Sequence, residues 1–360
     1  MNVDGIPHRS IWFEDDTATL RIIDQTRLPH EFVIAALHTL DDACHAIGSM
    51  QVRGAPLIGV TAAFGLYLAL RTGSGSAVMM DAAARLAATR PTAVNLRWAL
   101  NRVMTAIAAH PEQDEATVAL ATARVLCAED VATCSRIGDH GLPLIDALWQ
   151  KKQKQGVVNI LTHCNAGWLA AVDWGTALAP VYKAVAAGIP VHVWVDETRP
   201  RNQGASLTAW ELARQQIPHT VISDNAGGHL MQAGRVDLCL VGSDRTTRQG
   251  AVCNKIGTYL KALAAWDNQV PFYVALPLST IDWEADSIPI EERDADEVTH
   301  IQGLNSQGRM DRVRLTPAGS PALNHAFDIT PGRLVTGLIT ENGIFNASAE
   351  GLARLKQTDS

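Results

Sequence analysis

Hydrophobic positions follow two different patterns along the chain, and the pattern changes near residue 156. In the first part, apolar residues recur at helical spacing with many alanines, which predicts a series of helices. These helices are expected over residues 40–47, 56–70, 77–88, 95–109 and 115–136. Two segments before them, 10–13 and 19–23, have β character and flank an acidic turn, which predicts a hairpin. We therefore predict a mainly helical N-terminal domain over residues 1–130 that carries a short β-hairpin sheet.

Beyond residue 156, short apolar runs alternate with helical segments. Strands are expected at 157–162, 191–195, 220–223, 238–241 and 272–276, with a late strand at 335–340. Helices are expected between them at 168–187, 206–216, 227–233 and 254–265. Such alternation is typical of a parallel sheet covered by helices on both faces. The predicted fold class is α/β, with a Rossmann-like C-terminal domain over residues 131–360, of which 131–156 form a helix and a connector.

Composition narrows the classes of function. The chain has 360 residues, 30 of them basic and 37 acidic, for a net charge of −7, so nucleic acid is not an expected partner. The longest uncharged stretch, 54–70, falls short of a membrane span and contains three glycines and a proline, so we expect a buried helix there and no membrane partner. Six cysteines without a C-x-x-C pair argue against a zinc ribbon or a disulfide scaffold. They fit a reducing cytoplasm, and residues 1–10 show no signal-peptide core.

Polar, ionisable and glycine residues follow each predicted strand of the second part. Because ligands of parallel sheets bind outside the carboxyl ends of the strands, this convergence predicts a small-molecule site. Neither a G-x-G-x-x-G after the first strand nor a P-loop is present, so a nucleotide is not the expected ligand. The spacing of His, Asp and Glu also suggests no metal ligand set. The chemistry therefore has to come from side chains.

Cys164 is the first candidate for that chemistry. It follows the strand at 157–162, at an expected strand-to-helix turn where amide groups and the helix dipole favour a thiolate. A buried structural cysteine is the alternative, and position alone does not decide between them. The neighbouring His163 should point to the opposite face of the strand, so we do not pair the two as a catalytic dyad.

Asp244 is the second candidate. It follows the apolar strand at 238–241, and apolar surroundings would favour its protonated form and suit a general acid. The alternative is a helix N-cap, which is weakened because residues 245–250 are expected to form a loop before the next helix.

Three basic residues are candidates for binding an anion. Lys255 lies where a helix is expected to begin, Arg53 stands just before the apolar helix at 56–70, and Arg90 precedes the helix at 95–109. A helix N-terminus beside a cation can hold a phosphate group. The alternative for each of them is an ordinary surface charge.

Nine motifs considered together resemble the methylthioribose-1-phosphate isomerase family. They occur in order between residues 24 and 343 and cover both predicted domains. They are 53–59 (RGAPLIG), 90–96 (RPTAVNL), 162–167 (THCNAG), 196–200 (DETRP), 242–245 (GSDR), 254–259 (NKIGTY), 275–282 (ALPLSTID), 288–293 (IPIEER) and 327–331 (FDITP). This family is related to the regulatory subunits of the exchange factor for translation initiation and to ribose-1,5-bisphosphate isomerase.

The resemblance implies an aldose–ketose isomerase of methionine salvage that converts 5-methylthioribose 1-phosphate to 5-methylthioribulose 1-phosphate. It assigns the catalytic roles to Cys164 and Asp244. It assigns the substrate contacts to Arg53, Gly54, Ala55, Arg90, Gln203, Asn254 and Lys255. It further implies a homodimer that needs no cofactor and no metal.

The chain departs from the family pattern at Ser243, Ala251, Trp168 and His325. These departures keep the catalytic positions but leave the 5-substituent of the substrate open, so an isomerase of 5-deoxyribose 1-phosphate or another ribose 1-phosphate is one alternative. A second alternative is a non-catalytic subunit that senses a sugar phosphate or a nucleotide. A third, a cysteine hydrolase, lacks a histidine base because His163 is expected to face away.

Overall fold

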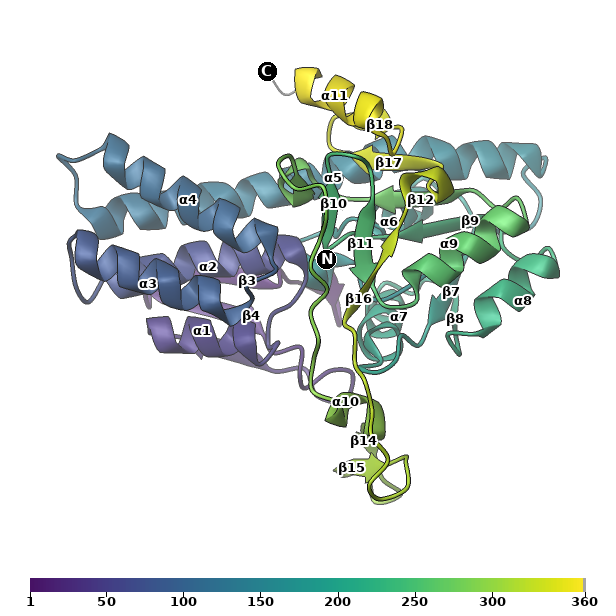
Figure 1. Cartoon of the computed structure of the whole chain (residues 1–360), viewed down its shortest axis with the longest axis horizontal. Coiled ribbons are helices and arrows are strands. Elements are labelled where there is room, and N and C mark those ends of the chain that lie inside the picture. The colour runs from purple at the N-terminus through teal and green to yellow at the C-terminus, as the bar shows by residue number, and fades with distance from the viewer. Residues whose placement is uncertain (359–360) are drawn as a thin grey trace.

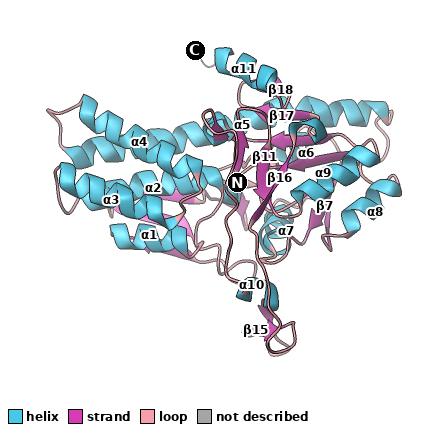
Figure 2. Ribbon diagram, viewed as in Figure 1, coloured by secondary structure: helices cyan, strands magenta, loops and turns pink. Residues whose placement is uncertain are grey.

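The computed structural model describes residues 1–358 and divides into a helical N-terminal part and a sheet-centred C-terminal part (Figure 1, Figure 2). The predicted α/β class is confirmed. None of the helices in the described residues combines the length and the apolar character that a membrane crossing requires.

The N-terminal part is built around one buried helix, α2 (Ala55–Leu70), in which every residue except Pro56 is buried. Four helices pack around it: α1 (Leu40–Gly48), α3 (Ser76–Thr89), α4 (Val94–Ala109) and α5 (Glu115–Lys151). Complete enclosure explains why residues 54–70 are uncharged. The five predicted helices are confirmed, and α5 extends 15 residues beyond the predicted end at 136.

The predicted hairpin is confirmed as β3 (Ile11–Glu14) and β4 (Thr19–Ile23), which pair antiparallel. A third strand, β5 (Ile34–Leu37), pairs with β4 and was missed. Its sequence, IAAL, does not alternate apolar and polar residues. Such alternation is the pattern that predicts a half-buried strand. A separate pair, β1 (Asn2–Val3) and β2 (Ile6–Pro7), precedes this sheet.

Helix α5 connects the two parts, because its 37 residues pass through residue 130. Val118 to Cys127 contribute to the N-terminal core, whereas Ile137 and Ile145 contribute to the core beneath the large sheet. The domain boundary at 130/131 stays a prediction.

The C-terminal part contains a seven-stranded sheet in the order β18-β17-β12-β9-β6-β7-β8, with only the edge strand β18 antiparallel. Its strands are β6 (Val158–Thr162), β7 (Val191–Asp196), β8 (His219–Ile222), β9 (Leu238–Val241), β12 (Phe272–Ala275), β17 (Gly337–Thr340) and β18 (Gly343–Phe345). All six predicted strands are therefore confirmed. Ile160 and Leu161 of β6 enter two different cores, so the sheet is covered on both faces.

The helices beside this sheet are α6 (Ala179–Ala186), α7 (Ala209–Arg214), α8 (Ala226–Gln232), α9 (Thr258–Asp267) and α11 (Ala349–Thr358). The long helix expected at 168–187 is wrong: a short turn, Trp168–Ala170, is followed by irregular chain up to α6. Gly175 has a φ of +75° and a Cβ there would lie 2.1 Å from a backbone carbon of Gly167, so this segment folds back on itself.

The loop expected at 245–250 and the helix expected at 254–265 are also wrong in part. Residues 245–255 form β10 (Arg245–Thr247) and β11 (Val252–Lys255), and α9 begins only at Thr258. These two strands join β13 (Ile281–Asp282) and β16 (Phe327–Thr330) in a second, four-stranded sheet. Helix α10 (Asp296–Thr299) leads into a protruding hairpin of β14 (His300–Leu304) and β15 (Met310–Arg314) (Figure 1).

Candidate active site

Cys164 lies directly after β6, in a backbone conformation that the surrounding hydrogen bonds hold. Its φ is +66°, which is uncommon for a residue with a side chain. Its amide donates to Oγ1 of Thr198 (2.8 Å), and its carbonyl accepts a hydrogen bond from Oγ1 of Thr208 (2.6 Å). The thiol, 3.4 Å from Oε1 of Gln203, is thereby aimed toward the loop after β7.

Asp244 reaches the same place from another strand. It follows β9 by three residues, and its amide donates to the carbonyl of Cys253 on β11 (2.9 Å). The residue continues into a strand and not into a helix, so the N-cap alternative is excluded. The second sheet, which the sequence did not predict, therefore fixes the backbone of Asp244.

The two side chains line one small cavity of about 30 Å³. Six of the nine predicted site residues line this cavity: Arg53, Gly54, Ala55, Cys164, Asp244 and Asn254. The cavity is therefore built from the start of α2, the ends of β6 and β9, and the strand β11.

Arg53 and Gly54 bring the N-terminal part to this cavity. The guanidinium of Arg53 donates to the side-chain and backbone oxygens of Asn165, the latter at 2.7 Å. Gly54 caps α2 with a φ of +94°, and a Cβ there would lie 2.4 Å from the carbonyl oxygen of Ala170. Only glycine permits this approach, and it leaves the N-terminus of α2 facing the cavity.

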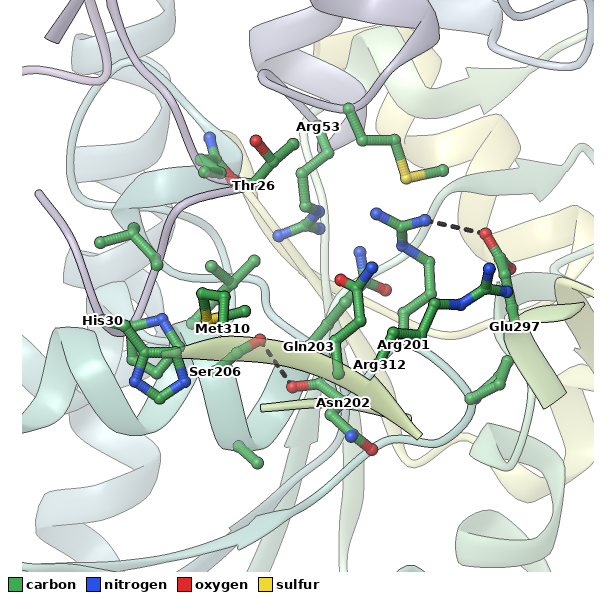
Figure 3. Close-up of a pocket in the computed structure, with 18 of the residues that line it drawn as sticks. Thr26, His30, Arg53, Arg201, Asn202, Gln203, Ser206, Glu297, Met310 and Arg312 are labelled. Carbon is green, nitrogen blue, oxygen red and sulfur yellow. Dashed lines mark hydrogen bonds and ion pairs between the residues drawn. The ribbon is translucent and has the colours of Figure 1, made fainter. Parts of the chain in front are cut away.

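A larger cavity of about 430 Å³ shares Arg53 with the small one and includes Gln203 (Figure 3). Its lining combines thioether and apolar side chains with basic ones. Among them are Leu28, Met50, Met310, Arg201 and Arg312. Figure 3 shows Arg201 paired with Glu297, at 2.8 Å. Met310 of the protruding hairpin and His30 both line this cavity.

Burial dominates the electrostatics of Cys164 and Asp244. It raises the pKa of Cys164, although the charges of Arg53 and Lys255 oppose this shift. It also raises the pKa of Asp244, against the opposing charges of Lys255, Arg53 and Arg90. Both groups are therefore biased toward their protonated forms. The expectation that the strand-to-helix turn favours a thiolate is wrong, because no helix begins there and desolvation outweighs the nearby cations.

Lys255 and Asn254 lie on β11 and not at a helix N-terminus, which corrects the expectation for this segment. Burial lowers the pKa of Lys255, opposed by Cys164 and Asp244. Its ammonium lies 4.5 Å from the ring centre of Phe327, and Asn254 donates to Oγ1 of Thr258 (3.0 Å). The amine of Lys255 thus interacts electrostatically with Cys164 and Asp244, although it does not line either cavity.

Arg90 follows α3 and also lies outside the lining of both cavities. Its guanidinium is 3.5 Å from the carboxylate of Glu291, and burial lowers its pKa. Nε of Arg90 is buried and, within residues 1–358, makes no hydrogen bond. One N–H of this residue is thus unsatisfied by the protein.

Two residues that organise the site were missed by the sequence analysis. Glu211 of α7 is fully buried and accepts hydrogen bonds from Asn165, Tyr182 and the amides of Trp168 and Leu169. Asn165 in turn holds Arg53. Glu211 lies within a predicted helix, and the sequence there gives no sign that its side chain is buried. Asn165 lies inside the 162–167 motif, so the motif could have identified it as a site residue.

His163 is bound away from the thiol, as predicted. Its Nδ1 lies 2.8 Å from Oδ2 of Asp196 and its Nε2 lies 2.8 Å from the carbonyl oxygen of Ile256. Both ring nitrogens are therefore engaged, which argues against a cysteine hydrolase.

His163, Asp196 and Asp224 place ligand atoms within 4.8 Å of one another, close enough for a metal ion. The ammonium of Lys261, however, lies 3.1 Å from Oδ2 of Asp196 and donates to the carbonyl oxygen of Asp224. A lysine thus supplies the positive charge in this cluster, and the donor set does not fit a metal as well as it fits this ammonium.

Comparison with known proteins agrees with this architecture. Residues 51–347 match the model of the initiation factor 2 subunit family. The methylthioribose-1-phosphate isomerase of Methylorubrum extorquens is 59% identical over 359 residues, which cover 99% of this chain and 98% of that protein. The protein of the same name from Acidiphilium cryptum is 60% identical over 360 residues, covering 99% of this chain and 97% of that protein.

Solved structures show the same relationship. The 5-methylthioribose 1-phosphate isomerase from Pyrococcus horikoshii OT3 superposes with a TM-score of 0.82 at 36% identity, covering 98% of this chain and 96% of that one. A structure described as translation initiation factor eIF-2B, subunit delta, from A. fulgidus has a TM-score of 0.78 at 37% identity, covering 97% and 100%. The chain belongs to the initiation factor 2 subunit family and, within it, to the methylthioribose-1-phosphate isomerases.

Proposed function

We propose that this chain is an aldose–ketose isomerase that converts 5-methylthioribose 1-phosphate to 5-methylthioribulose 1-phosphate in methionine salvage. The observation that carries the proposal is the placement of Cys164 and Asp244, which follow two separate strands, around one small cavity with Arg53 at its wall. The full-length relatives with this name support the choice of substrate.

The substrate explains why an acid is needed. Its anomeric carbon carries the phosphate, so no free aldehyde exists in equilibrium and the ring has to be opened on the enzyme. Asp244 is suited to this step, because burial raises its pKa and favours the protonated carboxyl. Its proton passes to the ring oxygen, the bond from that oxygen to C1 breaks, and C1 becomes electron-deficient.

Hydrogen then moves from C2 to C1 by one of two routes. In the first, a thiolate of Cys164 takes the proton from C2, and the electrons of that bond form a C1–C2 double bond. The thiol then returns the proton to C1 while the 2-hydroxyl proton passes to the carboxylate of Asp244, which leaves the ketone. In the second, hydride passes directly from C2 to C1, and the proton of the 2-hydroxyl returns to the carboxylate of Asp244. The raised pKa of Cys164 favours the neutral thiol and therefore the hydride route, in which the thiol polarises an oxygen of the substrate.

The remaining predicted residues are assigned to binding. Arg53, Arg90, Lys255 and the N-terminus of α2 at Gly54 and Ala55 hold the phosphate. Gln203 and Asn254 orient the sugar hydroxyls. The 430 Å³ cavity provides room for the rest of the ribose and its 5-substituent, and the thioethers of Met50 and Met310 suit a methylthio group.

The decisive assay compares purified protein on the 1-phosphates of 5-methylthioribose, 5-deoxyribose and ribose. The proposal expects the highest kcat/KM with methylthioribose 1-phosphate. A preference for 5-deoxyribose 1-phosphate would favour the alternative isomerase. No turnover of any of the three would favour a non-catalytic subunit that senses a sugar phosphate or a nucleotide. The similarity to the A. fulgidus structure is the reason to test this alternative.

Two substitutions test the catalytic pair. Cys164→Ala and Asp244→Asn should each lower kcat by roughly 10²–10⁴-fold, because each removes a group that acts on the reacting atoms. Cys44→Ala and Asp41→Asn, which change residues of the same type in α1, are the matched controls and should keep wild-type kcat. Wild-type turnover in either test variant would refute the assignment.

Solvent deuterium separates the two routes. Direct hydride transfer leaves C1 of the ketose without label in deuterated water, whereas a thiolate route allows exchange. Full labelling at C1, measured by mass spectrometry or NMR, would exclude hydride transfer.

We further propose that the protein is a cytoplasmic homodimer. A reducing compartment suits its six free cysteines, of which five are buried. Sedimentation equilibrium gives the oligomeric state directly, and a monomer at micromolar concentration would contradict the dimer.

A further inference from the structure

The motif at 288–293 plays no part in the site as predicted, yet the structure brings it against Arg90, one of the predicted substrate-binding residues. It lies between β13 and α10, far along the chain from the N-terminal helices. Glu291 nevertheless contacts the loop that joins α3 to α4, which carries Arg90 and Thr92. A carboxylate from the C-terminal part thus lies against a predicted phosphate-binding arginine of the N-terminal part.

Three groups hold this carboxylate. Thr92 donates from its hydroxyl to Oε2 of Glu291 (3.1 Å), and Arg293 donates to Oε1 (3.0 Å). The guanidinium of Arg90 lies 3.5 Å from Oε2. The side chain of Glu291 is only 18% exposed and that of Arg90 only 11%, so solvent screens this pair far less than a surface pair.

We propose that Glu291 is a positioning residue of the isomerase, which holds Arg90 where the two parts of the chain meet and places a carboxylate charge near Asp244. The inference rests on the proposed function, in which Asp244 is the acid and Arg90 a phosphate ligand. One terminal nitrogen of Arg90 lies 3.5 Å from Glu291, and the buried Nε makes no hydrogen bond within residues 1–358, so the guanidinium keeps a donor for the substrate.

The charges around both carboxyls agree with this role. Burial alone would raise the pKa of Glu291, but Arg90, Arg293 and Thr92 outweigh it and hold the pKa below its usual range, so Glu291 is ionised. That negative charge contributes to the raised pKa of Asp244. The charged and titratable groups that face Asp244 are Lys255, Arg53, Arg90, Glu291, Cys164 and Cys253.

Removing the charge should therefore shift the pH dependence of catalysis. A general acid loses activity as the pH rises through its pKa, and a lower pKa for Asp244 moves this loss to lower pH. We expect Glu291→Gln to move the alkaline limb of the kcat profile down by at least about half a pH unit, as removal of one nearby partly buried charge requires. Because Arg90 loses its support, kcat/KM at the optimum should also fall about 10-fold.

Glu292→Gln is the matched control, since it makes the same chemical change one residue further along at an exposed position. It should keep the wild-type profile. Thr92→Val removes one hydrogen bond without changing any charge, so it should lower kcat/KM but leave the alkaline limb in place. If Glu291→Gln does not fold, which its thermal unfolding curve reveals, Glu291→Asp keeps the charge and is expected to keep the wild-type limb with a lowered kcat/KM.

If the pH profile of kcat for Glu291→Gln superposes on that of Glu292→Gln, the inference is overturned. A lowered Tm together with an unchanged alkaline limb of that profile would show a purely structural role for Glu291 and would also overturn it. A second measurement needs no substrate: in protein labelled with ¹³C at the aspartate carboxyls, the resonance assigned to Asp244 should titrate at lower pH in Glu291→Gln. That measurement tests Glu291 even if the wild-type protein proves inactive on methylthioribose 1-phosphate, which would overturn the proposed function alone.

Discussion

At the scale of single residues, burial acts on Cys164 and Asp244 in the same direction. It favours the thiol and the carboxylic acid over their ionised forms, although Arg53 and Lys255 stand close to both. A nearby phosphate dianion would favour the protonated forms further. The site is therefore better suited to donating protons and polarising oxygens than to acting through a thiolate. This property comes from the burial of the two side chains and not from the residue types alone.

Asp130 of α5 shows the same effect outside the catalytic pair. Burial and the negative charges of Asp173 and Glu341 raise the pKa of Asp130 to about 7. The hydrogen bond that Asp130 accepts from the amide of Val172 (2.7 Å) lowers the pKa but does not offset these effects. The folded protein thus keeps a proton that the unfolded chain releases near pH 4. The contribution of Asp130 to the free energy of unfolding therefore falls as the pH rises from about 4 to about 7, and this loss ends above the folded pKa.

Asp130→Asn should remove that loss, because an amide does not titrate and its oxygen can still accept from Val172. We expect the stability of the variant, relative to wild type, to increase between pH 5 and pH 8. Urea unfolding at the two pH values measures the difference. Asp146→Asn, on the same helix, should show no such increase, and an equal effect in the two variants would contradict the assignment to Asp130.

Residue types and motifs predicted six of the residues that line the small cavity, and Gln203 of the larger one, but not the residues that support them. Cys164, Asp244 and Arg53 stand at the ends of recognisable elements or in motifs. Glu211 gave no signal, because a glutamate looks the same in sequence whether it is solvated or buried under four hydrogen bonds. Glu291 lies in the 288–293 motif, but the motif alone does not show that its carboxylate reaches Arg90. Their roles depend on contacts between segments that are far apart in the chain.

At the scale of elements, spacing predicted the strands better than the helices of the C-terminal part. Most of these strands are short apolar runs between polar residues, and their length and flanking residues together identify them. The segment at 168–187 has an apolar composition typical of a helix, yet glycine contacts at Gly167 and Gly175 and the hydrogen bonds to Glu211 hold it in irregular chain. Tertiary contacts there override the local preference.

The packing of α5 on α6 provides a test at this scale. Gly141 lies inside α5, and a Cβ there would be 2.4 Å from Cγ of Pro180 in α6. Alanine favours a helix over glycine by up to about 1 kcal/mol, but overpacking costs about 1–3 kcal/mol. Gly141→Ala should therefore lower the free energy of unfolding.

Gly48, the last residue of α1, is the matched control for that substitution. A Cβ there meets no atom within 4 Å, so Gly48→Ala should leave stability unchanged or raise it by about 0.5–1 kcal/mol. Chemical denaturation of both variants gives the comparison. A stabilised Gly141→Ala variant would mean that the two helices separate more easily than their close contact indicates.

At the scale of the whole molecule, the site exists only where the two parts of the chain meet. Arg53 and Arg90 come from the helical part, whereas Cys164 and Asp244 come from the edge of the large sheet. Direct hydrogen bonds join the two sides: Asn95 of α4 donates to Oγ of Ser279 (2.9 Å) and accepts from Thr280 (3.2 Å), and Thr92 donates to Glu291. Composition predicted two parts but could not predict which surfaces face each other.

This arrangement predicts how a ligand affects unfolding. A sugar phosphate held from both sides binds only when both parts are folded, so it should stabilise them together. With Cys164→Ala protein to prevent turnover, methylthioribose 1-phosphate at 100 times its Kd should add about 2.7 kcal/mol to the free energy of unfolding. In a calorimetric scan we expect one transition that moves to higher temperature as a whole. Two transitions of which only one shifts would mean that a single part binds the ligand, and the assignment of Arg53 and Arg90 to the phosphate would then be wrong.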